Sequence, residues 1–215
     1  LSTGVINSPM YGSKISVVSG NFIMARPHGV VDGVDFGLTG HVRSIDVKAI
    51  THHSEQDSIV LIPAVGYSMS GDIFNLSYEA LAADVAIKLS AEKLIFFGHD
   101  SGLKNSQGAL LPQITVDEAK YFKELNHTDS DITLDQEQRN QLMAAANACD
   151  GGVPRVHLLS YVHDGALLEE LFTRDGHGTM VSTDHYDQIR PARLEDTNGI
   201  LELIRPLEEQ GYLVR

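Results

Sequence analysis

Short apolar segments alternate with helical patterns between residues 59 and 181, and this alternation limits the folds that the chain can adopt. Three segments have the length and apolar content of buried strands: residues 59–63, 94–97 and 156–159. Three stretches repeat apolar residues at helical spacing: residues 79–93, 117–125 and 134–149. Strands that alternate with helices form parallel sheets with right-handed crossovers and helices on both faces. The pattern therefore predicts an α/β fold with a mainly parallel central sheet.

The segment before residue 59 has a different pattern. A strand is predicted at residues 15–19, and it can continue at 22–24. Glycines then recur at positions 29, 33, 37 and 40, which is typical of hairpins with tight turns. Residues 65–71 follow the strand at 59–63, and we expect them to form a flexible loop at its carboxyl end, where ligands bind in α/β sheets.

Composition excludes several classes of protein. The chain has 215 residues, of which 42% are hydrophobic and 21% charged, as in a soluble globular protein of one to one and a half domains. The net charge of -13 argues against nucleic acid and anionic membranes as partners and favours a cationic ligand. No apolar run reaches the ~18 residues that cross a bilayer. Cys149 is the only cysteine, so we expect a buried thiol and a reducing, cytoplasmic location.

Residues 151–181 are predicted to form a turn, a buried strand, a short helix and a glycine turn. Asp164 is the expected N-cap of the helix. Four apolar residues recur at the spacing of one helix face: Leu167, Leu168, Leu171 and Phe172. The loop at residues 176–179 offers backbone groups beside the carboxylates of Glu169 and Glu170, so a cationic small molecule could bind there.

The order of these pieces resembles a known family. The letters V-H-L-L-S at residues 156–160, followed by G-A-L-L-E-E-L-F-T-R-D-G-x-G-T-M at 165–180, resemble the carboxyl-terminal segment of the amino-acid kinase fold in arginine-sensitive acetylglutamate kinases and N-acetylglutamate synthases. Residues 35–42, D-F-G-L-T-G-H-V, resemble the family's D-x-G-x-x-G-x-V segment. The resemblance implies an amino-acid kinase-like (carbamate kinase-like) sandwich.

The family's carboxyl-terminal segment helps to form an allosteric L-arginine site, and the residues that match it here are His157, Glu170 and Gly176. The guanidinium carries a planar fork of donors, which a carboxylate and fixed carbonyls match best. Glu170 is the expected carboxylate, and Glu169 should point about 100° away on the helix. Taken singly, the pieces are also consistent with a core histidine and an ordinary glycine turn.

The pattern of residues changes after Tyr186. Asp196 or Thr197 can cap a helix, and Pro206 would start a second short helix that ends near Gly211. The apolar residues of the first helix are spaced for one face: Ile200, Leu203, Ile204 and Leu207. This pattern resembles the first elements of the GNAT acyltransferase fold.

An amino-acid kinase-like segment that is followed by a GNAT-like segment resembles the tandem domain arrangement of N-acetylglutamate synthases. Residues 1–185 would be an amino-acid kinase-like regulatory domain that lacks its amino-terminal part, and residues 186–215 would be the truncated start of a GNAT domain. The full-length form would transfer an acetyl group from acetyl-CoA, its cosubstrate, to L-glutamate in arginine biosynthesis. The acetyl-CoA site would lie outside this chain, which alone is expected to be inactive. A homo-oligomer is expected.

Most residues that phosphoryl transfer requires are replaced. The family's K-x-G-G strand would precede Leu1, and its G-G-M-x-x-K segment is matched by Q-E-Q-R-N-Q at residues 136–141, which places Gln141 at the lysine position. The family's acid falls near Glu79. We therefore assign no catalytic residue. The alternatives to an arginine sensor are a working acetylglutamate kinase, which phosphorylates N-acetylglutamate with ATP, and a scaffold that only builds the oligomer.

Ten histidines raise the question of a metal site. They include an adjacent pair at 52 and 53 and single residues at 163, 177 and 185. No pair has the H-x3-H spacing of a helical metal site, and the chain has no pair of cysteines, so we predict no metal. The chain also has no G-x-S-x-G elbow for a serine nucleophile.

Overall fold

The structure is a computed structural model that describes residues 12, 15–124, 134–173, 176–183, 197 and 204–205. The chain forms two compact units, Leu1–Asp184 and His185–Arg215. In the second unit the described residues Thr197, Ile204 and Arg205 are helical. The other residues on which we predict caps, apolar contacts and a second helix lie outside the described residues, and the GNAT assignment stays a prediction.

One four-stranded sheet carries the segment that resembles the amino-acid kinase fold. Its order is β10 (Gln113–Thr115), β12 (Thr179–Ser182), β11 (Arg155–Ser160) and β9 (Leu94–Gly98). The pairs β9 with β11 and β10 with β12 are parallel, whereas β11 and β12 are antiparallel. The helices α3 (Val116–Glu124) and α4 (Gln136–Asp150) precede β11 in the chain. The α/β class is confirmed, and the sheet is mixed.

A second four-stranded sheet has the order β5 (Gly40–Ile45), β2 (Ile23–Pro27), β7 (Val65–Tyr67) and β8 (Ile73–Asn75). We predicted a flexible loop at residues 65–71. This prediction is wrong, because β7 and β8 form an antiparallel hairpin. Ser70 and Ser68 donate hydrogen bonds to the carboxylate of Asp72 in the turn, and these bonds lower the pKa of Asp72. A short polar turn therefore occupies the place where we expected a ligand-binding loop.

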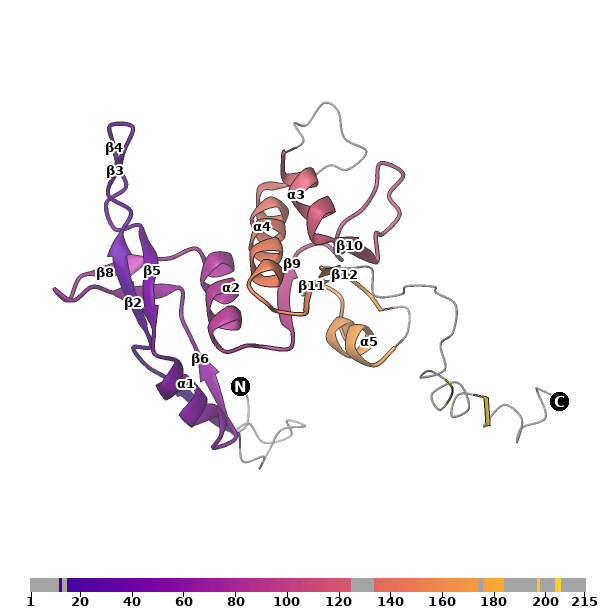
Figure 1. Cartoon of the computed structure of the whole chain (residues 1–215), viewed down its shortest axis with the longest axis horizontal. Coiled ribbons are helices and arrows are strands. Elements are labelled where there is room, and N and C mark those ends of the chain that lie inside the picture. Colours follow the sequence, from indigo (N-terminus) through magenta and orange to yellow (C-terminus); the bar gives the residue numbers. More distant parts are fainter. Residues whose placement is uncertain are drawn as a thin grey trace. The chain divides into compact units, whose positions relative to one another are not determined.

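The glycine-rich segment forms hairpins, as predicted. β3 (Val30–Val31) and β4 (Val34–Asp35) pair in antiparallel fashion and are seen as a narrow hairpin in Figure 1. Asp32 and Gly33 have φ angles of 51° and 80°, as a two-residue type I′ turn requires. A further parallel pair joins β1 (Ser16–Ser19) to β6 (Ser58–Leu61).

Polar side chains define where the helices begin. α1 (Val47–Ser54) was not predicted, because only Ile50 among its residues is buried and no apolar period is visible. The carboxylate of Asp46 accepts a hydrogen bond from the amide of Ala49 at 3.0 Å and caps this helix. α2 (Tyr78–Lys88) is capped by Ser77 in the same way, and it ends five residues before the predicted boundary.

Two apolar clusters stabilise the two larger sheets. The first joins α4 to β9, β11 and β12, and Figure 1 shows this helix alongside the strands. The small side chains of Ala145 and Ala148 let the helix lie close to the sheet. The members of this cluster with no exposed surface include Leu142, Ala145, Ala148, Val156 and Val181. The second cluster lies on the other sheet and includes Ile23, Ala25, Ile50, Phe74 and Leu81.

Cys149 belongs to the first cluster, as its place in the helical pattern predicts. Its thiol lies 3.6 Å from the carbonyl oxygen of Val181, to which it donates a weak hydrogen bond. Burial, with a smaller contribution from Asp150, raises the pKa of this thiol to about 11. The thiol is therefore a core group without nucleophilic character at neutral pH.

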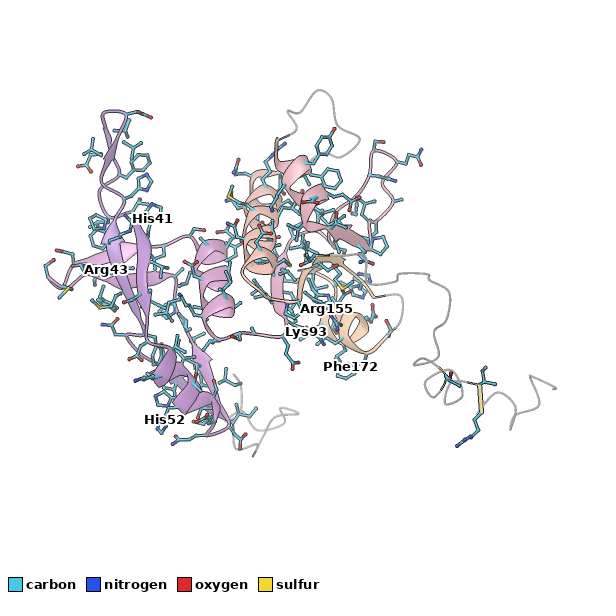
Figure 2. All side chains as sticks on the ribbon, viewed as in Figure 1. His41, Arg43, His52, Lys93, Arg155 and Phe172 are labelled. Carbon is cyan, nitrogen blue, oxygen red and sulfur yellow. The ribbon has the colours of Figure 1, made fainter. Side chains whose placement is uncertain are left out.

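α5 (Ala166–Phe172) has little apolar packing of its own. It begins after Gly165, whose φ is 85°, so the cap predicted at Asp164 is wrong. Ala166 is its one buried residue, whereas Leu168 and Phe172 are 62% and 81% exposed. Figure 2 shows Phe172 directed away from the ribbon. Polar contacts must therefore hold this helix in place. None of the described helices has the length and apolar character to span a membrane.

Candidate functional site

Glu170 of α5 is the centre of a buried polar cluster that also contains His157 of β11. Oε1 of Glu170 lies 2.6 Å from Nδ1 of His157, and each side chain is 6% exposed. Oε2 of Glu170 accepts hydrogen bonds from the backbone amides of His177 at 2.7 Å and Gly178 at 3.0 Å. One carboxylate thus links the strand, the helix and the loop that precedes β12.

These contacts favour the ionised form of Glu170. Burial alone would raise the pKa of the carboxyl, but the hydrogen bond from His157 and those from the amides of His177 and Gly178 outweigh it, so the pKa lies below its ordinary value of 4.5. The side chain therefore carries a negative charge at neutral pH, with fixed donors around it. Such a charge requires its donors, because an unpaired buried carboxylate is strongly destabilising.

Gly176 allows the loop to approach this carboxylate. Its φ is 61°, and a Cβ atom built on it would lie 2.6 Å from Oε2 of Glu170. Both the backbone angle and the space therefore disfavour any other residue. The structure brings together all three residues that the sequence resemblance singles out, and their role as an arginine site stays a prediction.

His157 has a second nitrogen that the cluster does not use. Its Nε2 is buried and has no hydrogen-bond partner among the described residues. When Nδ1 donates to Glu170, Nε2 of a neutral ring is an acceptor. A carboxylate offers about four lone-pair positions, and three are occupied in Glu170. The cluster therefore has acceptor capacity left for a donor-rich cation.

A second polar network lies at the residues that match the kinase machinery. Gln141 is buried, and its Nε2 donates a hydrogen bond to the hydroxyl of Tyr78 at 3.2 Å. That hydroxyl in turn donates to the carboxylate of Glu137 at 3.0 Å. Burial is the main cause that raises the pKa of Tyr78. The side chain at the family's lysine position is therefore a neutral member of a hydrogen-bonded network.

Glu79, near which the family's acid falls, is also buried, with 6% of the residue exposed. Its carboxylate accepts hydrogen bonds from Ser77 at 2.6 Å and from Asn140 at 3.4 Å. Both donors are uncharged side chains.

The cleft beside Gln141 is too small and too acidic for a nucleotide. Its cavity volume is about 10 Å³, which is room for one water molecule. Its described lining residues include three acids, Asp100, Asp135 and Glu137, and neither lysine nor arginine. Phosphoryl transfer needs cations around the transferred group. This cleft cannot supply them.

The fold indicates the class of protein, and comparison with known proteins agrees. The profile of the Amino acid kinase family matches residues 1–160, and the chain belongs to this family. The amino-acid acetyltransferase of Azotobacter vinelandii is 48% identical over the whole chain, which covers 48% of that protein. The chain thus spans about half the length of the curated relatives that it matches.

Solved structures give the same picture. The N-acetylglutamate synthase of Neisseria gonorrhoeae, complexed with coenzyme A and L-arginine, matches with a TM-score of 0.82 and 36% identity. The match covers 94% of this chain and 46% of the other. The same enzyme with coenzyme A and N-acetyl-glutamate gives a TM-score of 0.74 and 40% identity over the same shares. The predicted amino-acid kinase-like fold is therefore confirmed.

Proposed function

We propose that this chain is the arginine-sensing, amino-acid kinase-like domain of an N-acetylglutamate synthase. The full-length protein would transfer an acetyl group from acetyl-CoA to L-glutamate, and residues 186–215 would begin the GNAT domain that carries out this reaction. Relatives named amino-acid acetyltransferase support the proposal, as does a solved N-acetylglutamate synthase that was crystallised with coenzyme A and L-arginine. We also expect the full-length protein to be a cytoplasmic homo-oligomer.

The cluster of Glu170 and His157 is the observation that carries the proposal. An arginine guanidinium has five N–H donors and no acceptor, so it needs a charged acceptor with further acceptors at fixed positions. Glu170 supplies the charge and its remaining lone-pair position, and His157 supplies Nε2. Gly176 keeps the loop backbone close to the same carboxylate. A lysine ammonium lacks the planar fork and would use these acceptors less well.

Arginine bound here would act on the elements that Glu170 connects. Its carboxylate joins β11, α5 and the loop before β12, so a ligand that competes for its lone pairs changes the contacts of all three. β12 ends at Ser182, just before the segment that we assign to the GNAT domain. We infer that arginine regulates acetyl transfer through β12.

Acetylglutamate kinase activity is the alternative, and the kinase network disfavours it. Gln141 stands where the family has lysine, and the adjoining cavity of about 10 Å³ is lined by three carboxylates. Acetyl-CoA and L-glutamate would bind to the GNAT domain, outside this chain. No catalytic residue is proposed within it.

Titration calorimetry of the full-length protein tests the proposal. L-arginine should bind, and L-lysine should bind much more weakly because it lacks the guanidinium fork. Acetyltransferase assays on the same preparation should respond to arginine, and an ATP-coupled assay with N-acetylglutamate should show no turnover above the rate without enzyme. Equal affinity for arginine and lysine would contradict the site, and kinase turnover would favour the alternative.

A further inference from the structure

A second group of polar side chains connects the two loops that flank α5. His163 precedes the helix, Glu169 lies on it, and His177 follows it. The ring of His163 is stacked on the ring of His177, with centroids 3.8 Å apart and planes at 18°. Nε2 of His163 makes a hydrogen bond of 3.2 Å with Oε2 of Glu169, and Nδ1 of His177 lies 3.3 Å from the same oxygen. The ring of His177 therefore contacts both other members of the group.

His177 belongs to this group through its ring and to the Glu170 cluster through its backbone. Its amide donates a hydrogen bond to Oε2 of Glu170 at 2.7 Å, which is the shorter of the two amide contacts to that oxygen. The ring and the amide of one histidine are joined through a short side chain with few rotatable bonds. A ring that is held in place therefore restricts the position of the amide.

The sequence of the loop makes this ring important. Residues 176–178 contain one side chain, because His177 stands between two glycines. Gly178 is buried, and a Cβ atom built on it would lie 2.4 Å from the carbonyl oxygen of Leu158, so the loop passes close to β11 there. A glycine has no side chain that can pack against a neighbour. The ring of His177 is therefore the side chain that anchors this part of the loop to α5.

We propose that His163 is a positioning residue for the Glu170 cluster. Its ring, stacked on that of His177, holds the amide of His177 where the carboxylate of Glu170 accepts its hydrogen bond. This role does not require a ligand, but its consequence for arginine rests on the proposed function. A carboxylate that is fixed in advance binds a cation more tightly, because less conformational freedom is lost on binding. His163 therefore increases arginine affinity without touching the ligand.

Stacking, more than the hydrogen bond to Glu169, accounts for the effect of His163. The side chains of His163 and Glu169 are 40% and 47% exposed, so water competes for the hydrogen bond between them. An aromatic pair is stabilised beyond the area that it buries, and water offers no substitute for the partner ring. Each neutral imidazole carries one N–H, so both rings can face Glu169 without a positive charge on either.

Amide hydrogen exchange of the full-length protein without ligand tests the positioning role. In His163→Ala the amides of His177 and Gly178 should exchange about two- to tenfold faster than in the parent, which is the factor expected for the loss of an aromatic pair. His163→Phe keeps a flat ring and should restore slow exchange. His163→Asn keeps a hydrogen-bond donor without the ring and should not. Titration calorimetry with L-arginine should rank the four proteins in the same order, with the Ala and Asn variants about two- to tenfold weaker.

His52→Ala is the matched control. His52 is an exposed histidine on α1 whose ring also contacts a second histidine, His53, with centroids 5.6 Å apart. Its removal should change neither the exchange of the two amides nor arginine affinity.

The proposal is overturned if His163→Ala leaves the exchange of the two amides unchanged, if it accelerates exchange uniformly along the chain, or if His163→Phe behaves like His163→Ala. Faster exchange without weaker arginine binding would refute the link to arginine. If the parent does not bind arginine, the proposed function fails, and amide exchange still decides whether His163 positions the Glu170 cluster.

Discussion

Glu79 and Glu170 are glutamates with little exposed side chain, but their surroundings differ. Glu79 accepts hydrogen bonds from two neutral side chains, Ser77 and Asn140, the second of them long at 3.4 Å. Glu170 accepts from an imidazole and two backbone amides, all at 3.0 Å or less. The carboxylate of Glu79 is held by side chains at the starts of α2 and α4, whereas that of Glu170 holds a loop.

The two carboxylates differ in the kind of donor that holds them. In the cleft beside Gln141 the hydrogen bonds are made by side chains, because Nε2 of Gln141 donates to the hydroxyl of Tyr78 and that hydroxyl donates to the carboxylate of Glu137. The donors of Glu170 are partly backbone, so they persist as long as the loop keeps its glycines. A site built from backbone amides is tied to the fold more closely than one built from lysines.

The largest expected effect is on arginine binding. Glu170→Gln should weaken it by ~1.5–3 kcal/mol, because a charge-assisted hydrogen bond is lost. The same substitution in the other buried glutamate, Glu79→Gln, should leave arginine affinity unchanged. Titration calorimetry on the full-length protein measures both. Equal losses in the two variants would remove the distinction between the two carboxylates.

Glu169→Gln is a poor control for this experiment. We expected Glu169 simply to point away from the arginine site, but its carboxylate lies against His163 and His177. The backbone of His177 contributes to the Glu170 cluster, so changes at Glu169 could reach it indirectly. Glu79→Gln alters a buried carboxylate whose hydrogen bonds come from Ser77 and Asn140, on other elements than the loop before β12.

The second-largest expected effect is on the free energy of unfolding and on its dependence on pH. The pKa of Glu170 is lowered from 4.5 in the folded protein, so its stabilising contribution is complete above that value and is lost as the pH falls through the folded pKa. Glu170→Gln should therefore lower the free energy of unfolding by ~1–2 kcal/mol at pH 7 and by less in acid. Urea unfolding at several pH values measures this. A constant difference between the proteins from pH 7 down to pH 3 would contradict the assigned role.

The residues of the Glu170 cluster were predicted because residues 151–181 resemble a segment of a known family; local patterns alone did not single them out. His157 lies on β11, Glu170 lies on α5, and Gly176 lies in the loop that follows. This order of strand, helix and turn was predicted correctly, except that Gly165 and not Asp164 caps the helix. The apolar face predicted for α5 turned out to be mostly exposed, since polar contacts replace packing there. Helical spacing alone does not reveal which face is covered.

Other features could be identified only in the folded structure and not from the sequence. The hydrogen bond between Glu79 and Asn140 joins residues that are 61 positions apart, so no local sequence pattern predicts it. α1 and β7 were missed because one has a single buried residue and the other has three residues with a central glycine. The group of His163, Glu169 and His177 has no recognised spacing, so it emerges only from the positions of two loops.

A smaller, local effect should be visible in amide hydrogen exchange. In Glu170→Ala the amides of His177 and Gly178 lose their acceptor, and they should exchange about tenfold faster for each ~1.4 kcal/mol of lost hydrogen bonding. The amide of Ala80, which donates to Ser77 beside the other glutamate, should be unaffected. Uniform acceleration across the chain would indicate global destabilisation instead of loss of the loop contacts.

The smallest expected effect tests the closed cleft. Gln141→Lys restores the residue type that the family carries at this position, yet we expect no ATP-dependent phosphorylation of N-acetylglutamate. One lysine faces Asp100, Asp135 and Glu137 in a cavity of about 10 Å³, so its charge is neutralised by protein carboxylates before any phosphate could approach. A coupled assay of the variant and the parent measures this. Turnover in the variant alone would mean that the cleft opens readily and that a single substitution, and not the closure of the site, separates this domain from a kinase.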